Sequence, residues 1–325
     1  MKQYLFGILV LLFLFGASPV RAQEVGEEEI VKIETTLVSV PVVVSDRDGR
    51  YVPNLKAGDF TVFQDGEKQK IEFFAAEEEP ANVALVLDTS PSTAGVIDQI
   101  KRAALDFTRL LRPEDRAMVV TFDTSTQFLS PMTSDRIELE RAIRSADIGP
   151  YIGTIMRDAV REVVERGFKN LKGRKAIILL TDGQDFGSRF DEDELLDMLE
   201  ESDVMIYTVY YQTEPANNFG RRRGRGRFGR RLPGGNGGRR REARRERAVE
   251  YLERMSELTA GRFYNKDVTD LSRTFAIIAD ELRKQYRLGF YPAGESSAGD
   301  VHQIKVRVGR ENVSVRSRSS YRTAR

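Results

Sequence analysis

The chain has 325 residues, of which 40% are hydrophobic and 31% are charged, a composition typical of a folded, water-soluble protein. It contains no cysteine and a single histidine, so disulfides, thiolate catalysis, cysteine-ligated metals and histidine relays are excluded. The formal net charge is only +1, but residues 221–247 carry thirteen Arg and two Glu. The rest of the chain after residue 22 has 36 basic and 48 acidic side chains. An acidic body therefore carries one strongly basic segment.

Residues 1–22 have the pattern of a secretory signal peptide. Lys2 precedes a nearly unbroken apolar run over residues 5–15, and Val20 and Ala22 occupy the positions expected before a cleavage site. A transmembrane anchor, the alternative, needs about 20 apolar residues, roughly twice the length of this run. No later apolar stretch is long enough to span a bilayer. We therefore expect an exported mature protein, periplasmic or secreted, without a transmembrane segment.

Two β-rich flanks enclose the middle of the chain. Residues 32–80 contain alternating and β-branched runs with a hairpin turn at residues 64–66, which predicts a small antiparallel unit. Residues 285–325 return to β-structure in three further runs. Each flank alone is too short to bury a good core. We therefore expect the flanks to pack together, with the α/β domain inserted between them; the alternative is that each flank packs separately on that domain.

Residues 81–284 alternate between strands and helices. Continuous apolar runs predict buried strands, and apolar residues three and four apart predict helices. The predicted strands are residues 83–87, 118–122, 126–129, 176–180, 204–209 and 262–264, and the predicted helices are residues 96–110, 136–145, 155–164, 248–258 and 271–282. This alternation predicts an α/β domain with a mainly parallel sheet and helices on both faces.

Oxygen-bearing side chains occur where these strands end. Asp88, Ser90 and Ser92 follow the first buried strand, Asp182 follows the strand at residues 176–180, and Thr154 precedes a helix. Ligands of open parallel sheets bind at this edge. Hard oxygen donors without nitrogen or sulfur suit Mg²⁺, Mn²⁺ or Ca²⁺. Because only two of the five donors are charged, a bound dication would stay electron-poor and accept a carboxylate from a partner, which is binding chemistry rather than catalysis.

These five positions, in this order and on these elements, resemble the metal-ion-dependent adhesion site of von Willebrand factor type A domains, over about residues 82–284. The flanks resemble those of exported bacterial proteins described only as von Willebrand factor A-related and typical of acidobacteria, through Val44, Asp46, Leu55, Asp59, Phe60, the turn at residues 64–66 and residues 286–292. The resemblance implies a Rossmann-like doubly wound sheet and a divalent cation, Mg²⁺ first, whose coordination a partner's Asp or Glu completes. It implies a non-enzymatic adhesion or protein-interaction module. The connection that contains residues 214–247 is longer than is usual in the family.

Other interpretations of the site residues explain fewer of them. The two serines could cap the following helix, but a cap explains neither Thr154 nor Asp182. Asp88 could be a phosphotransferase nucleophile, but Ser90 stands where that chemistry needs a second acid. A hydrolase would need a general base, a nucleophile motif or a histidine relay, and the sequence suggests none. Asp185 is interpreted as a solvated loop residue rather than as an acid that supports the site.

The arginine-rich segment permits an alternative function. The first two-thirds of residues 221–247 are rich in glycine and are predicted to be disordered, on the same rim as the cation site. The candidate polyanion-binding residues are Arg221, Arg222, Arg223, Arg225, Arg227, Arg230 and Arg231. They could bind an anionic envelope polymer, with the metal site kept for stability, or form a solvated insertion. Phe228 is the only aromatic residue there, and export also disfavours nucleic acid.

Overall fold

The computed structural model of the protein describes residues 37–76, 79–212, 235–292, 294 and 297–323. The predicted signal peptide lies outside these residues, as do the seven candidate polyanion-binding arginines. In the described part of the chain, no helix is both long and apolar enough to cross a membrane.

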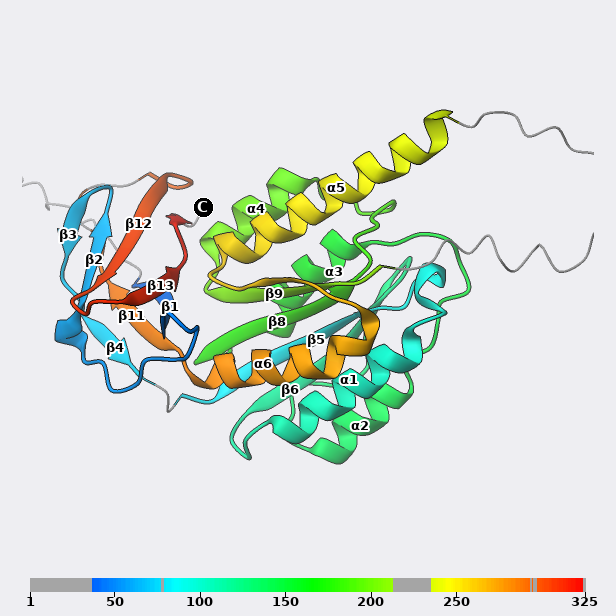
Figure 1. Cartoon of the computed structure of the whole chain (residues 1–325), viewed down its shortest axis with the longest axis horizontal. Coiled ribbons are helices and arrows are strands. Elements are labelled where there is room, and N and C mark those ends of the chain that lie inside the picture. The colour runs from blue at the N-terminus through cyan, green and yellow to red at the C-terminus, as the bar shows by residue number, and fades with distance from the viewer. Residues whose placement is uncertain (1–36, 77–78, 213–234, 293, 295–296, 324–325) are drawn as a thin grey trace, which may run out of the picture. The chain divides into compact units, whose positions relative to one another are not determined.

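A six-stranded sheet forms the centre of the α/β domain (Figure 1). Its strands lie in the order β10-β9-β8-β5-β6-β7, and β7 alone is antiparallel to its neighbour. The strands are β5 (Ala81–Asp88), β6 (Arg116–Phe122), β7 (Thr126–Phe128), β8 (Arg174–Thr181), β9 (Val204–Tyr210) and β10 (Phe263–Asn265). Every residue of β5 and β9 is buried, as expected for strands covered on both faces. The predicted mainly parallel, doubly wound sheet is confirmed.

Helices cover both faces of this sheet. One face carries α1 (Ile97–Leu110), α2 (Arg136–Arg144) and α6 (Leu271–Arg283), and the other carries α3 (Met156–Glu162), α4 (Glu192–Glu201) and α5 (Gly235–Leu258). Side chains alternate along β5, so Leu85 and Leu87 belong to the first core and Ala84 and Val86 to the second. Burying each of these leucines stabilises the fold by about 1.5–3 kcal/mol. The strand therefore fixes the position of the polar residues that follow it.

Two helices differ from the sequence prediction. The sequence pattern predicts no helix between residues 181 and 204, yet α4 lies there. Its start has a capping box, in which the Asp191 carboxylate accepts from the main-chain N–H of Glu194 and the Glu194 carboxylate accepts from that of Asp191. Helix α5 begins at Gly235 rather than at Ala248. Arginine and alanine both favour helix formation, so the helix extends into the arginine-rich segment.

Strands from both flanks form two four-stranded sheets, with the orders β13-β1-β11-β4 and β14-β12-β2-β3. The strands are β1 (Val38–Asp46), β2 (Phe60–Gln64), β3 (Glu67–Gln69), β4 (Phe73–Ala75), β11 (Tyr286–Phe290), β12 (Val301–Val308), β13 (Val313–Ser317) and β14 (Ser320–Arg322). Strand β1 pairs antiparallel with β11 and β13, and β2 pairs antiparallel with β12. Strands that precede and follow the α/β domain thus belong to the same sheets.

The two flank sheets share one hydrophobic core. Val42 of β1, Val62 of β2 and Leu288 of β11 are completely buried in it. The hydroxyl of buried Tyr286 donates to the carbonyl of Val52 (2.8 Å), so its polar end is satisfied inside this core. We call this eight-stranded unit the flank sandwich.

Arginines near the C-terminal end of the flank sandwich contact helix α4. Arg318 is 5% exposed, and its guanidinium donates to the carbonyls of Ser202 (2.8 Å) and Glu200. Arg322 forms ion pairs with the carboxylates of Asp197 and Glu200. The last carbonyls of a helix lack intrahelical partners and attract cations. These side chains therefore attach the flank sandwich to the end of α4.

Candidate metal site

Asp88 is the last residue of β5 and is fully buried. Its Oδ1 accepts hydrogen bonds from the main-chain N–H of Ser90 (3.0 Å) and from the Ser90 hydroxyl (2.5 Å). Its Oδ2 accepts a hydrogen bond from the Thr181 hydroxyl at the end of β8 (3.0 Å). The carboxylate is therefore held in one orientation by residues of two neighbouring strand ends.

The two predicted serine ligands lie together beside Asp88. The hydroxyl oxygens of Ser90 and Ser92 are 3.0 Å apart. The turn that carries them is closed by the Thr93 hydroxyl, which donates to the carbonyl of Ser90 (2.8 Å). Ser90 makes no side-chain capping hydrogen bond, and Val96 occupies the N-cap position of α1. The alternative interpretation of the serines as helix caps is therefore wrong.

Asp182 follows β8 and is 6% exposed. Its two oxygens accept hydrogen bonds from the main-chain N–H (3.1 Å) and the side-chain amide (2.7 Å) of Gln184. Burial and, secondly, the negative charge of Asp182 raise the pKa of Asp88 to about 7, although the hydrogen bonds from Ser90 and Thr181 lower it. The two carboxylates thus interact electrostatically, in a site that disfavours the charge of Asp88.

Thr154 lies on the loop before α3 and is 3% exposed. Its carbonyl accepts from the main-chain N–H groups of Phe186 (3.1 Å) and Gly187 (3.0 Å), on the loop that follows Asp182. The N–H of Ile155 donates to the carbonyl of Asp123, just after β6 (2.8 Å). The main chain around Thr154 therefore ties together loops that follow different strands.

The five predicted residues are brought together in different ways. Asp88, Ser90 and Ser92 are joined by direct hydrogen bonds, and Asp182 acts electrostatically on Asp88. Thr154 is connected through the main chain of its loop. We call these five residues the cation site, after the ligand that the sequence predicts for them.

The sequence predicts Asp185 to be a solvated loop residue, and this prediction is wrong. Its side chain is 5% exposed and accepts from the main-chain N–H of Arg157 (3.0 Å) and from the Ser188 hydroxyl (2.7 Å). Arg157 is in the first turn of α3, where main-chain N–H groups lack intrahelical partners and favour negative charge. Asp185 therefore fixes the loop after Asp182 to the helix after Thr154.

Sequence reasoning also missed Thr181 and Gln184, which hold the two carboxylates of the cation site. Both adjoin predicted residues, but no spacing rule separates a threonine that orients a carboxylate from one that merely ends a buried strand. The only signal for Thr181 is its place in the pattern Thr181-Asp182-Gly183, directly before the predicted ligand Asp182.

The donor set suits a hard cation. In the part of the chain that the structure describes, no group of three or more His, Asp or Glu side chains could hold a metal ion. The cation site instead combines two buried carboxylates with hydroxyl oxygens, and oxygen donors of this kind are those of Mg²⁺, Mn²⁺ and Ca²⁺. A divalent cation would also offset the burial of the Asp88 charge and its repulsion by Asp182, which together raise the pKa of Asp88.

Comparison with known families assigns this region. Residues 83–184 match the family model of the von Willebrand factor type A domain. This region belongs to the von Willebrand factor type A family. The match runs from β5 to Gln184, so it contains all five residues of the cation site. No curated protein sequence matches the chain.

Several solved structures are similar to the chain. The hypothetical protein BatB from Bacteroides thetaiotaomicron is 19% identical, with a TM-score of 0.45 over 62% of this chain and 97% of BatB. Proximal thread matrix protein 1 from the mussel byssus, solved with a zinc-occupied MIDAS motif, is 16% identical, with a TM-score of 0.49 over 69% of this chain and 50% of that one. The von Willebrand factor domain of the type V pili tip protein Mfa5 from Porphyromonas gingivalis is 13% identical, with a TM-score of 0.43 over 67% of this chain and 98% of that one.

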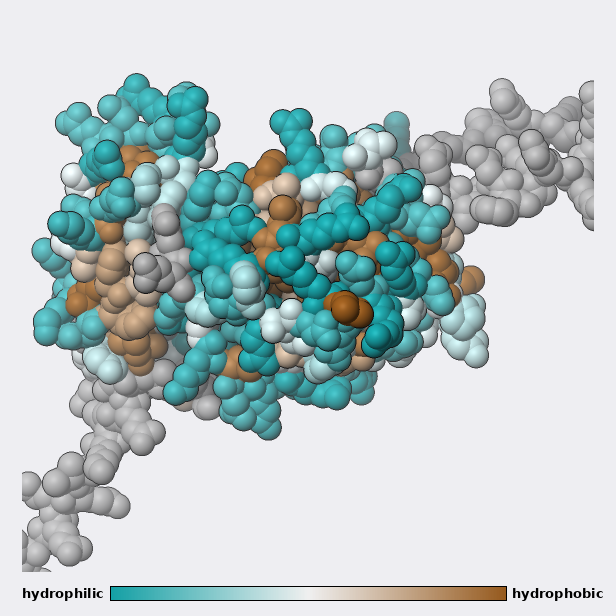
Figure 2. All heavy atoms as spheres, turned by 90° about the horizontal axis from the view of Figure 1, so that it is seen from below, coloured by the Kyte–Doolittle hydropathy of each residue, from teal (hydrophilic) through white to brown (hydrophobic). Residues whose placement is uncertain are grey.

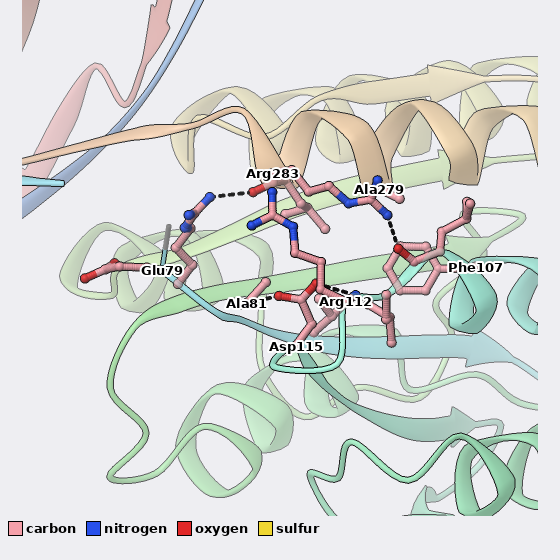
Figure 3. Close-up of a pocket in the computed structure, with 12 residues that line it drawn as sticks. Glu79, Ala81, Phe107, Arg112, Asp115, Ala279 and Arg283 are labelled. Atoms are coloured by element: carbon pink, nitrogen blue, oxygen red, sulfur yellow. Dashed lines mark hydrogen bonds between the residues drawn. The ribbon is translucent and has the colours of Figure 1, made fainter. Parts of the chain in front are cut away.

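A cavity lies where strand β5 begins, at the other end of this strand from Asp88 (Figure 3). It is lined near the start of β5 by Asp115 and Arg174, and between α1 and α6 by Arg283. The Arg174 guanidinium donates to the carbonyl of Leu282 (2.7 Å), and that of Arg283 donates to the carbonyl of Leu110. Both carbonyls end helices of the type A domain, so these arginines stabilise the helix ends. The cavity contains none of the residues predicted to bind a ligand.

Proposed function

We propose that the protein is an exported interaction module that binds an acidic side chain of a protein partner through a divalent cation. Asp88, Ser90, Ser92, Thr154 and Asp182 would hold the cation, and the partner's Asp or Glu would complete its coordination. The proposed activity is binding and not catalysis.

The buried pair Asp88 and Asp182 is the observation that carries this proposal. A charged carboxylate is costly to bury, and a second one beside it raises that cost. Yet Asp88 is oriented by three hydrogen bonds, and Asp182 by two. A fold that orients two buried carboxylates by hydrogen bonds, and holds Asp88 where its charge is unfavourable, supports a cation as their ligand. The membership of this region in the type A family supports the same interpretation.

Mg²⁺ is the cation we propose first, with Mn²⁺ and Ca²⁺ as alternatives. Mg²⁺ binds to one or two carboxylates and keeps several coordination positions for water or for a ligand. The cation site offers two carboxylates and neutral hydroxyls, so a bound Mg²⁺ would retain positive charge for an incoming carboxylate. The same donor set lacks the nitrogen and sulfur ligands that zinc and copper prefer.

We further propose the domain organisation that the sequence suggests. Residues 1–22 would be a cleaved signal peptide, and residues 81–284 a type A domain that contains an arginine- and glycine-rich insertion at residues 214–247. Residues 32–80 and 285–325 would form one flanking domain; the pairing of β1 with β11 and β13 supports this. The mature protein would be periplasmic or secreted.

Calorimetry with Mg²⁺ tests the cation site. We compare the wild type with Asp88→Asn, which keeps the shape of the side chain and removes its charge. Asp280→Asn is the matched control, because Asp280 is an exposed aspartate of α6 that pairs only locally, with Lys284. We expect the wild type and the control to bind Mg²⁺ alike and Asp88→Asn to lose binding. Equal Mg²⁺ affinity of the wild type and Asp88→Asn would contradict the proposal.

A second candidate function is polyanion binding, and the start of helix α5 favours it. Six of the residues at positions 239–247 are arginines, two are glutamates, and all nine residues are exposed. In Figure 1 the first turns of α5 extend beyond α4. Such a cluster of positive charge attracts anionic polymers or anionic envelope surfaces.

Salt and chelator separate the two candidates. Binding of heparin, used as a model polyanion, should weaken with moderate salt and should not respond to EDTA. The triple variant Arg240→Ala, Arg241→Ala and Arg244→Ala should bind heparin less tightly than the wild type does. Equal heparin binding by the variant and the wild type would contradict the assignment of polyanion binding to the start of α5.

A further inference from the structure

Three large hydrophobic side chains are exposed beside the cation site. Ile152 is 94% exposed, Tyr151 is 69% exposed and Phe186 is 62% exposed. Tyr151 and Ile152 lie on the loop that leads to Thr154, and Phe186 lies on the loop that follows Asp182. Figure 2 shows hydrophobic side chains at the right-hand end of the α/β domain, the end at which the loops after β5 and β8 lie in Figure 1.

The main chain that carries these side chains is held by hydrogen bonds. The N–H of Phe186 donates to the carbonyl of Thr154 (3.1 Å), so the two loops are bonded to each other. The N–H of Gly149 donates to the carbonyl of Thr89 (2.9 Å), which attaches the first loop to the turn between Asp88 and Ser90. The exposed hydrophobic side chains are therefore presented by ordered loops at a fixed place around the carboxylates.

We propose that Tyr151, Ile152 and Phe186 form an apolar rim that binds large hydrophobic side chains next to the acidic residue of a polypeptide partner. The inference rests on the proposed function, because the cation site supplies the contact for the acidic residue. Exposed apolar surface that borders a polar site is typical of interaction surfaces.

Charge and side-chain chemistry decide the kind of partner. The cation site, when loaded, attracts a carboxylate, whereas the apolar rim gains from contact with hydrophobic groups. Acidic polysaccharides offer carboxylates without large apolar side chains beside them. An anionic membrane surface offers hydrocarbon only beneath its headgroups. Three side chains on two bonded loops provide little apolar surface to insert to that depth. A polypeptide with Asp or Glu beside Phe, Leu, Ile or Tyr offers both groups on adjacent residues.

The probe for this inference is a phage-displayed library of random heptapeptides, selected on the full mature chain in Mg²⁺ and eluted with EDTA. We expect the eluted peptides to carry Asp or Glu beside a large hydrophobic residue. Synthetic copies should bind the double variant Ile152→Ser and Phe186→Ser at least about tenfold more weakly than the wild type. Both substituted side chains are exposed, so the variant should fold normally.

Ile137→Ser is the matched control, because Ile137 is 70% exposed but lies on α2, away from the two loops. The control should bind the peptides as the wild type does, and all three proteins should bind Mg²⁺ equally in calorimetry. The inference is overturned if the double variant retains full peptide affinity, or if the selected acidic residues have no hydrophobic neighbours. It is also overturned if the double substitution instead abolishes vesicle binding or self-association of the chain. A wild type that takes up no Mg²⁺ would instead refute the proposed function, and with it this inference.

Discussion

Replacing Asp88 by asparagine should stabilise the metal-free protein while it abolishes cation binding. In the presence of EDTA, the wild type must hold the charged Asp88 in a fully buried position beside Asp182. Asparagine has nearly the same shape and carries no charge. The substitution therefore removes the unfavourable burial of charge and keeps the packing at the end of β5.

The pKa shift of Asp88 sets the size of this effect. A rise from the ordinary value of 3.8 to about 7 is about three pKa units, which corresponds to about 4 kcal/mol of destabilisation by the charged form. Asparagine keeps one oxygen for the two hydrogen bonds from Ser90 but presents an amide group to the Thr181 hydroxyl. A mismatched buried hydrogen bond costs about 1–3 kcal/mol. We therefore expect a net gain of about 1–3 kcal/mol in the free energy of unfolding.

The sign of the pH dependence follows from the same shift. The pKa of Asp88 is higher in the folded than in the unfolded protein, so ionisation of Asp88 opposes folding. The penalty is nearly absent at about pH 4, grows as the pH rises towards 7, and is complete above the folded pKa. The advantage of Asp88→Asn over the wild type should follow the same course.

Urea denaturation in EDTA measures this difference. The wild type, Asp88→Asn and the control Asp280→Asn are compared at about pH 4 and about pH 8. We expect Asp88→Asn to unfold at higher urea concentration than the wild type at the higher pH only, and the control to match the wild type at both. The reasoning is refuted if Asp88→Asn is the less stable protein at about pH 8, or if its advantage is equal at both pH values.

Three further predictions concern cation linkage and the packing of the fold. At a Mg²⁺ concentration a hundredfold above the dissociation constant, the wild type should gain about 2.7 kcal/mol of stability and Asp88→Asn should gain none, as thermal unfolding would show. Gly261→Ala should destabilise the fold by about 1–3 kcal/mol or more in urea, because the new Cβ would lie 1.8 Å from the main-chain oxygen of Ile206; a variant as stable as the wild type would contradict this. Arg318→Met should lower the free energy of unfolding by about 2–4 kcal/mol in the same urea assay, because it removes two charged hydrogen bonds to the end of α4. The control Arg310→Met, at an exposed site, should leave that free energy almost unchanged.

The sequence predicts the α/β domain well because its signals are local. Strand β5 is buried along its whole length, and a strand covered on both faces appears in sequence as one uninterrupted apolar run. The positions of Asp88 and Asp182 follow from the same signal. Asp88 is the last residue of β5, and Asp182 directly follows β8. Once the sheet is parallel, both carboxylates lie at one edge of it.

Features absent from the sequence prediction have two causes, contacts between distant residues and misinterpreted local signals. Asp185 looks like a loop residue because its partner Arg157 is 28 positions away, and only the fold brings the carboxylate to the first turn of α3. Helix α4 has a good local signal in its capping box, and its omission is an error of interpretation rather than a limit of the sequence. The start of α5 was misplaced because glycine and arginine were taken together as a sign of disorder, although arginine favours the helix.

The pairing of β1 with β11 has a consequence for the order in which the protein folds. Val38 pairs with Phe290, so this contact joins residues separated by most of the chain. Closing so long a loop in an unfolded chain is entropically costly, and contacts of this range form slowly. A folded α/β domain shortens the effective loop, because Ala81 at its start and Leu282 near its end line the same cavity. We therefore expect the flank sandwich to close late, around a domain that has already folded.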